Sequence, residues 1–313
     1  MRSVLFLTLV FLTFSCLHGS TSFIEISTYH NVKSMRLNLN SRIINGTKAA
    51  SRQFPHQVSL MHTRIGHHFC GGSIISIKSV LTAAHCMYRN GTLISPREII
   101  VVGGVLKLNE NTATRQERGV TEFRIHPEFI LNTLQNDVAV LQLSAPFEFT
   151  PEVYSVPLPI NPIVPETLCQ VSGFGIRNKY WRVSNNLMYV DLPIRSITEC
   201  RELVVNETDL PAGMFCAGYL EGGRDACHAD SGGGMVCNGI LTGIVSFGIG
   251  CGRPKLPGVY TDIFYYLNWI SENENVRMPR GFDNSRCSNG THKMPTIIVL
   301  MISFLLVLLS VIS

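Results

Sequence analysis

Three short segments of the chain carry side chains that together could attack a carbonyl group. The first reads T-A-A-H-C and contains His85, and the second reads N-D-V-A-V-L and contains Asp137. The third reads D-A-C-H-A-D-S-G-G and contains Ser231. A serine hydroxyl is a poor nucleophile at neutral pH, so it needs an adjacent base, and the base needs a third group to fix its tautomer. Serine, histidine and aspartate supply these three types of group.

Taken singly, each segment has an ordinary alternative, since a histidine beside a cysteine is usually structural and Asn-Asp before a strand is usually a turn. Together, in this order and with the cysteines that accompany them, they resemble the chymotrypsin/trypsin family of serine proteases over roughly residues 42–275. The resemblance implies that Ser231 attacks the peptide carbonyl, that His85 acts as general base and then general acid, and that Asp137 orients His85. We expect no cofactor and no metal.

Asp230 adjoins Ser231 but has a different expected role. In the family, cleavage releases a new N-terminus that becomes buried and pairs with this carboxylate. Here the cleavage would follow Arg42 and release the α-amino group of Ile43. An isolated buried charge is very costly, so each group needs the other. The resemblance therefore implies a zymogen, which a trypsin-like protease activates by cutting after arginine.

Asp225 lies six residues before Ser231, where the family places the base of its primary specificity pocket. A carboxylate at the bottom of a narrow pocket selects a cationic side chain. Gly248 and Gly258 match the positions that keep this pocket open, and Ser246 begins the stretch that pairs with substrate backbone, with Phe247 in place of the usual tryptophan. The expected cut follows Arg or Lys.

Two residues depart from the family pattern G-D-S-G-G-P, namely Ala229 and Gly234. Ala229 stands where a glycine offers its N–H to the oxyanion, beside the N–H of Ser231. Alanine keeps the donor but restricts positive φ, and loss of one oxyanion donor costs about 10²–10³ in rate. Two alternatives therefore accompany the active endopeptidase: a catalytically weak or inactive homologue that binds or regulates, and an adhesive or structural surface protein.

Ten cysteines occur in the chain, and Cys16 belongs to the leader described below. Sequence alone cannot pair the remaining nine. The resemblance implies four disulfides: Cys70–Cys86, Cys169–Cys237, Cys200–Cys216 and Cys227–Cys251. Cys287 is left over, either as a free thiol, which we favour, or as a partner for another chain.

The fold class follows from short apolar runs broken by Gly, Pro and Asn. The runs Ile99–Val102, Val138–Leu143 and Ile240–Phe247 are typical of strands and favour an all-β barrel or sandwich. The resemblance narrows this to two six-stranded antiparallel barrels packed together, with a C-terminal helix over Phe264–Glu274. We expect a signal peptide at 1–19, a propeptide at 20–42, the protease domain at 43–276, a linker at 277–294 and a hydrophobic tail at 295–313.

The tail is almost wholly apolar and has the length needed to cross a bilayer. It could be a spanning helix or a GPI signal that is removed, and the absence of a positive charge behind it favours GPI. We expect the protein on the extracellular face of the plasma membrane, or secreted. The secretory route makes four N-x-[ST] sequons usable. They are Asn45, Asn90, Asn206 and Asn289.

The net charge of +4 is weak and scattered, which gives no case for nucleic-acid binding. His62, His67 and His68 lie close in sequence, but no cysteine or acid completes a zinc pattern, so we expect a polar surface cluster there. The expected partners are protein or peptide substrates with Arg or Lys, an activating trypsin-like protease, serine protease inhibitors, and the membrane through the tail.

Overall fold

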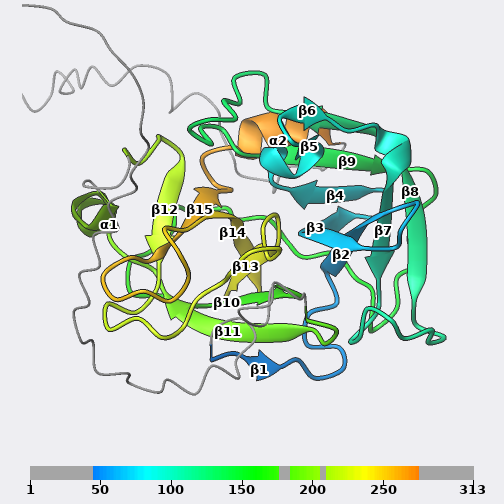
Figure 1. The fold of residues 1–313 in the computed structure, drawn as a ribbon, viewed down its shortest axis with the longest axis horizontal. Helices are drawn as coiled ribbons and strands as arrows, with labels where there is room; N and C mark the ends of the chain where they lie inside the picture. Colours follow the sequence, from blue (N-terminus) through cyan, green and yellow to red (C-terminus); the bar gives the residue numbers. More distant parts are fainter. Residues whose placement is uncertain (1–44, 176–183, 205–208, 275–313) are drawn as a thin grey trace, which may run out of the picture. The chain divides into compact units, whose positions relative to one another are not determined.

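The structure is a computed structural model that describes residues 45–175, 184–204 and 209–274. Several sequence predictions lie outside these residues: the signal peptide, the propeptide with Arg42 and Ile43, the linker with Cys287, the tail, and the sequons at Asn206 and Asn289. The regular secondary structure of the described residues is mostly β-sheet, and it is arranged in two halves (Figure 1).

The first half is a closed antiparallel barrel of six strands, in the order β2-β3-β4-β9-β8-β7. These strands are β2 (Gln57–His62), β3 (His68–Ser76), β4 (Ser79–Thr82), β7 (Ile99–Gly103), β8 (Gln116–Ile125) and β9 (Ala139–Leu143). Val58, Leu60, Ile74 and Leu141 point into its core and are fully buried. A closed barrel leaves no unpaired sheet edge, so its backbone groups are satisfied internally.

The second half is a seven-stranded antiparallel sheet in the order β1-β11-β10-β13-β14-β15-β12. Its strands are β1 (Thr47–Lys48), β10 (Leu168–Gly173), β11 (Met188–Pro193), β12 (Met214–Ala217), β13 (Gly234–Cys237), β14 (Ile240–Phe247) and β15 (Gly258–Asp262). The sheet curls until the end of β11 meets β12, where Ile194 bridges Ala217 and Arg195 N–H donates to the carbonyl of Cys216 at 2.9 Å. The remaining strand, β1, pairs along the outside of β11.

Helical structure is short in the described residues. Two 3₁₀ turns, η1 (Ala84–Met87) and η2 (Pro96–Glu98), flank the small hairpin of β5 (Tyr88–Arg89) and β6 (Thr92–Leu93). The α-helices are α1 (Ile197–Val204) and α2 (Leu267–Asn273). In the part of the chain that the structure describes, no helix has the length and apolar character required to cross a membrane.

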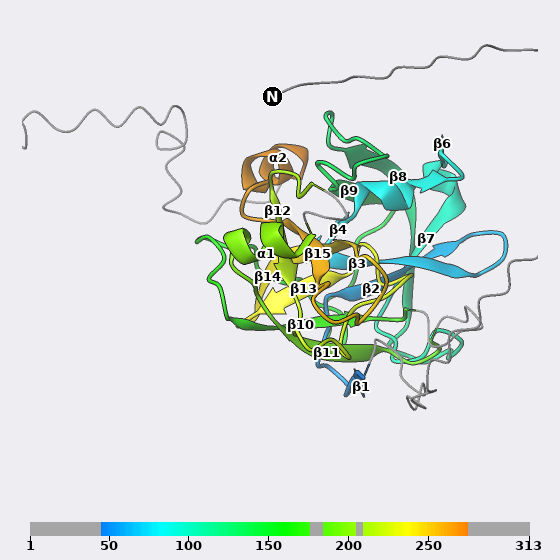
Figure 2. The same ribbon diagram turned by 60° about the vertical axis from the view of Figure 1, so that its left-hand side comes forward.

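Helix α2 follows the second sheet in sequence but packs on the first barrel, beside β9 and β4 (Figure 1). Figure 2 shows the same helix, in orange, at the edge of the molecule. Leu267 and Ile270 are buried in the core of that barrel. The carboxylate of Glu274, just after the helix, accepts hydrogen bonds from Ser76 Oγ at 2.8 Å and Gln142 Nε2 at 2.9 Å. The last described residues thus tie the two halves of the molecule together.

The predicted all-β fold with two barrels and a C-terminal helix is confirmed. The expected strand at Ile240–Phe247 has the predicted bounds, and α2 lies inside the helix expected over Phe264–Glu274. Four disulfides join the pairs that the resemblance implies: Cys70–Cys86, Cys169–Cys237, Cys200–Cys216 and Cys227–Cys251.

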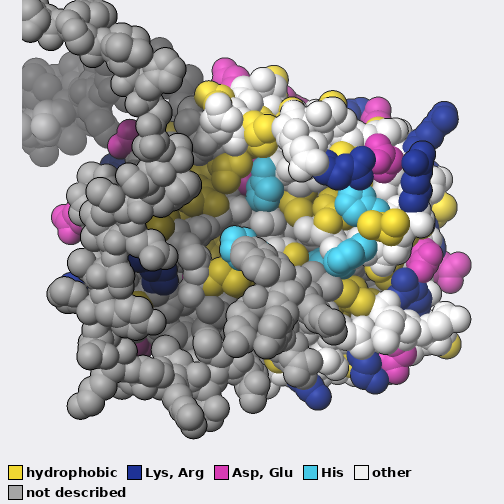
Figure 3. Space-filling model, in the orientation of Figure 1, with side chains coloured by type: hydrophobic (Ala, Val, Ile, Leu, Met, Phe, Trp, Pro, Cys, Tyr) yellow, Lys and Arg dark blue, Asp and Glu magenta, His cyan; other side chains and the backbone are white. Residues whose placement is uncertain are grey.

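The expectation of a surface histidine cluster is wrong for one of its three members. Histidine side chains do appear on the face shown in Figure 3, and His67 is exposed. His68, however, is only 4% exposed, because it lies on β3 and turns its ring toward the second half of the molecule. His67 precedes this strand and is exposed, whereas the ring of His68 binds the carbonyl of Ala229.

Candidate active site

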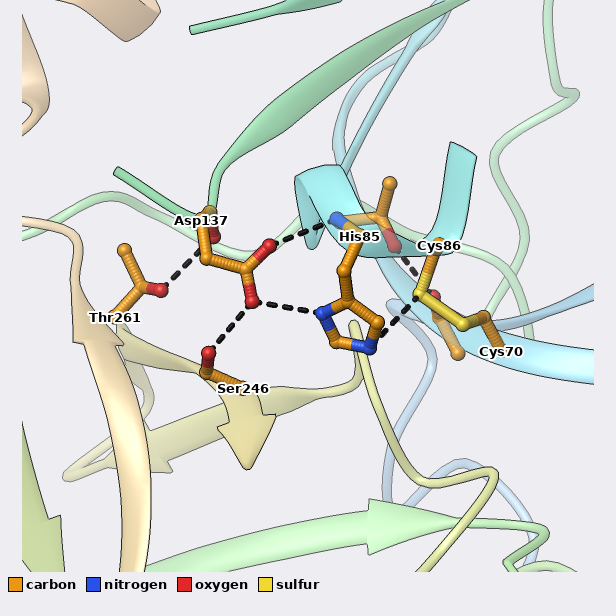
Figure 4. A network of polar contacts seen from close by, with 8 residues as sticks. Cys70, His85, Cys86, Asp137, Ser246 and Thr261 are labelled. Carbon is orange, nitrogen blue, oxygen red and sulfur yellow. Dashed lines mark hydrogen bonds and ion pairs between the residues drawn. A yellow bond between two sulfur atoms is a disulfide. The ribbon is translucent and has the colours of Figure 1, made fainter. Parts of the chain in front are cut away.

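The side chains of His85 and Asp137, which both come from the first half of the molecule, are joined by a hydrogen bond (Figure 4). His85 lies in η1, and its Nδ1 is 2.8 Å from Oδ2 of Asp137. The other oxygen, Oδ1, accepts the backbone N–H of His85 at 2.8 Å. Both oxygens of this fully buried carboxylate therefore hold the histidine in one orientation.

Two residues of the second half fix Asp137 from the opposite side. Ser246 on β14 donates its hydroxyl to Oδ2 at 2.6 Å, and Thr261 on β15 donates to the backbone carbonyl at 2.9 Å (Figure 4). Since Asp137 precedes β9 of the first barrel, these two bonds fix the position of the second half relative to the first. They also place a carboxylate where it can stabilise a charged imidazole.

The pKa of His85 is raised above its ordinary value of 6.5. Burial lowers the pKa, but the charge of Asp137 and the hydrogen bond to it raise the pKa by more. The site thus supports a proton on the ring, which a general base needs after it has accepted one.

Ser231 lies where the two halves meet. Its carbonyl accepts the N–H of Gly71 on β3 at 2.8 Å. Among the described residues, no hydrogen bond joins its hydroxyl to Nε2 of His85, which lies 3.9 Å from Sγ of Cys86. Such bonds are often long in free enzymes and tighten when substrate binds.

A pocket of about 150 Å³ opens beside Ser231. Its walls come from the segment before Ser231 and from the ends of β14 and β15. The lining includes Asp225, Ala226, His228, Ser231, Ser246, Phe247, Gly248, Gly258 and Tyr260. The structure therefore brings together every residue that the sequence predicted for substrate binding.

Asp225 is the acid of this pocket and is only 2% exposed. Its Oδ2 accepts the N–H of Gly252 at 2.9 Å, whereas its Oδ1 and the hydroxyl of Tyr260 are buried without a hydrogen-bond partner among the described residues. A Cβ on Gly258 would lie 2.9 Å from Oδ1, so only glycine leaves this space open. Burial raises the pKa of Asp225 to about 7, which marks a carboxylate that lacks a cation.

Asp230 is fully buried on the other side of Ser231. Its oxygens accept the N–H groups of Gly175 at 2.7 Å and Cys227 at 3.0 Å. A Cβ on Gly173 or Gly175 would come within 2.1 Å of the carboxylate, so both glycines make room for it. Burial raises the pKa of Asp230 to about 7, so this acid too lies in a place that favours its neutral form.

Ala229 has a left-handed backbone conformation, with φ of +68°, which glycine would adopt without steric cost. Its carbonyl accepts a hydrogen bond from Nε2 of His68 at 2.9 Å. Burial lowers the pKa of His68 to about 4, so the ring is neutral and its Nδ1 must accept from the hydroxyl of Ser59, 2.7 Å away. The hydrogen bond from His68 to the carbonyl of Ala229 stabilises the conformation of the loop that contains Ala229.

Three residues of the site were missed by sequence reasoning, namely His68, Tyr260 and Thr261. Each lies on a strand, and each acts through a partner far away in sequence. The only available signal was the position of Tyr260 and Thr261 just after Gly258. Contacts of this kind depend on strand register, which the sequence does not display.

A double β-barrel that joins a histidine–aspartate pair to a serine beside a narrow pocket defines a serine endopeptidase. The family model described as Trypsin matches residues 43–270. Trypsin II-P29 of Gallus gallus is 37% identical over 233 residues, covering 74% of this chain and 88% of the relative. Trypsin of Sus scrofa is 37% identical over 232 residues, covering 74% and 95%. Trypsin-1 of Astacus astacus is 35% identical over 237 residues, covering 74% and 99%. The chain belongs to the trypsin family of serine proteases.

Proposed function

We propose that this protein is the secreted zymogen of a membrane-tethered endopeptidase that cleaves after Arg or Lys, through an acyl-enzyme formed on Ser231. The observation that carries this proposal is the buried Oδ1 of Asp225, which has no hydrogen-bond partner among the described residues and belongs to the pocket that Ser231 also lines. His85 and Asp137 are the base and its orienting acid, and the N–H groups of Ala229 and Ser231 are the oxyanion donors.

Specificity for cations follows from the pocket's chemistry. A buried carboxylate with a free lone pair costs free energy until a positive group pairs with it. A guanidinium or ammonium supplies the charge and the donors together, whereas an aromatic or aliphatic side chain supplies neither. Ser246, Gly248 and Gly258 then shape the wall along which the substrate lies.

The zymogen proposal is supported by the surroundings of Asp230. Two backbone N–H groups bind this carboxylate but do not neutralise it, and burial raises its pKa more than these bonds lower it. The α-amino group of Ile43, once released by cleavage after Arg42, would supply that charge. The expected activator is therefore a trypsin-like protease, and serine protease inhibitors are expected partners of the active form.

Active-site labelling tests this proposal. We expect the secreted protein, cleaved after Arg42 by trypsin, to react with a fluorophosphonate at Ser231, since the labelling needs a basic His85 and an ordered oxyanion site. Arg42→Gln is the matched control, because it retains the whole site but resists the cut. Equal labelling of Arg42→Gln and the cleaved protein would contradict the proposal that cleavage activates the protein. Absence of labelling in both proteins would contradict the proposal that it is an endopeptidase.

Membrane attachment is proposed from the apolar tail at 295–313. GPI transfer would remove the tail, whereas a spanning helix would retain it. Phosphatidylinositol-specific phospholipase C on intact cells distinguishes these two forms of anchor, because it releases only the lipid-linked one. In both forms the protease faces the extracellular side.

Replacing Ala229 by glycine is expected to raise kcat while changing KM less. A left-handed alanine costs about 1–2 kcal/mol, and relief of this strain lets the loop adjust to the oxyanion, a contact that strengthens in the transition state. Steady-state kinetics with an arginine ester and an arginine amide measure the effect. A kcat at or below that of the natural protein would show that the loop is already optimal with alanine.

A further inference from the structure

The sequon Asn45-Gly46-Thr47 lies at the start of the described residues. It leads into β1, which is an edge strand of the seven-stranded sheet. Thr47 pairs with Tyr189 across β1 and β11, and both sequon side chains are exposed. Asn45 has φ of +53°, a left-handed conformation that asparagine tolerates better than most residues. An exposed sequon on a turn before an edge strand is accessible to glycosylation.

The amide of Asn45 already has one partner. Its Nδ2 donates to the carbonyl of Gly223 at 2.6 Å. Gly223 N–H in turn donates to Gly252 O at 2.8 Å, and Gly252 N–H donates to Asp225. A side-chain amide carries two hydrogens, so this bond leaves one hydrogen for replacement, and a glycosylated Asn45 can keep its contact with Gly223.

A groove of about 370 Å³ adjoins this amide. Its lining combines an aromatic ring, a carboxylate and a guanidinium, from Tyr189, Asp191 and Arg224. Asp191 accepts from Gln170 at 2.9 Å, and the guanidinium of Arg224 lies 4.6 Å from the centre of the Tyr219 ring, so both charged groups are held in place. The volume falls within the range of small-ligand sites, about 300–1,000 Å³.

We propose that Asn45 carries an N-linked glycan whose first sugar lies in this groove and whose bulk shields the Arg42–Ile43 bond from the activator. The proposal rests on the secreted zymogen proposed above. The donor is a lipid diphosphate-linked oligosaccharide: its anomeric carbon bonds to Nδ2, the bond from that carbon to the diphosphate breaks, Nδ2 loses one proton, and lipid diphosphate leaves. The sugar hydroxyls then face the acceptor of Asp191 and the donors of Arg224.

Shielding follows from the distance along the chain. Asn45 is the third residue after the bond that the activator must cut. A protease holds its substrate as an extended segment on both sides of that bond, with side chains in alternate pockets. A branched oligosaccharide on the third residue would clash with the walls of the activator's substrate cleft. The activator therefore binds the Arg42–Ile43 segment more weakly, and cleavage is slowed.

The experiment compares secreted proteins from the same cells. Thr47→Val removes the sequon but keeps the Asn45 amide and a β-branched strand residue, and Thr47→Ser is the matched control that keeps the sequon. We expect mass spectrometry to find glycan on Asn45 in the natural protein and in Thr47→Ser, and none in Thr47→Val. We expect trypsin to release the Ile43 N-terminus severalfold faster from Thr47→Val than from either of the others.

Two results would overturn the proposal. One is an unmodified Asn45 in the secreted natural protein, and the other is equal release of Ile43 from all three proteins. Thermal unfolding checks that Thr47→Val is folded, and enzymatic deglycosylation of the natural protein gives a second route to the same comparison. Fluorophosphonate labelling after cleavage reports on the proposed protease independently, because it is unaffected by the rate at which Ile43 is released.

Discussion

Asp225→Ser is expected to lower kcat/KM for arginine substrates by about 30-fold to about 4,000-fold, because losing one member of a buried charge pair costs about 2–5 kcal/mol and each 1.4 kcal/mol is tenfold. The carboxylate is 2% exposed and its Oδ1 has no protein partner, so the substrate cation supplies the only pairing charge in the described pocket. A peptide library and steady-state kinetics with matched Arg and Phe substrates measure the change. Phe substrates should be affected little.

The pH dependence of inhibitor binding provides the control for this substitution. Burial raises the pKa of Asp225 from 3.8 to about 7, so the carboxyl is neutral below that pH and charged above it. A cationic inhibitor such as benzamidine should therefore bind more tightly as pH rises through about 7, and Asp225→Ser should lose this dependence. The same pKa shift also predicts that the free energy of unfolding falls as pH rises from about 4 to about 7, because the folded state holds the proton of Asp225 more tightly than the unfolded state does. Wild-type cleavage mainly after aromatic residues would contradict the assignment.

Asp137→Asn is expected to lower kcat by about 10⁴, the size established for this change in enzymes of this class. The hydrogen bonds dictate how the amide must lie. Oδ1 accepts a backbone N–H of His85, which cannot reverse, whereas Oδ2 accepts from Ser246 Oγ, whose hydroxyl can turn. The amide nitrogen must therefore replace Oδ2 and donate to Nδ1 of His85. The ring is then forced to carry its proton on Nε2 and cannot take one from Ser231.

Ser246→Ala is the matched control, since it removes a bond to the same oxygen but leaves the carboxylate and its charge. We expect a much smaller loss of kcat from this variant. Asp137→Asn should also lower the pKa of His85, because burial would remain while the charge that raises the pKa would be gone. NMR titration of the histidine reports this directly. A kcat for Asp137→Asn close to that of Ser246→Ala would show that Asp137 does not set the tautomer.

Much of the fold and site could be predicted because the informative residues are local. The strand Ile240–Phe247 is bounded by turn-forming neighbours, and the segment from Asp225 to Ser231 carries the pocket acid, the buried acid and the nucleophile within one loop. His68 could not be placed in the same way. Its burial depends on the pairing of β2 with β3 and on the carbonyl of Ala229, which is 161 positions away.

Each of the four disulfides in the described chain lies within one half of the molecule. Cys70–Cys86 belongs to the first barrel, and the other three belong to the second half. The line between the halves is crossed instead by hydrogen bonds at the site itself, such as Ser246 to Asp137 and Gly71 to Ser231. Disulfide formation therefore stabilises each half separately, whereas the alignment of the nucleophile with its base depends on buried, non-covalent contacts between the halves.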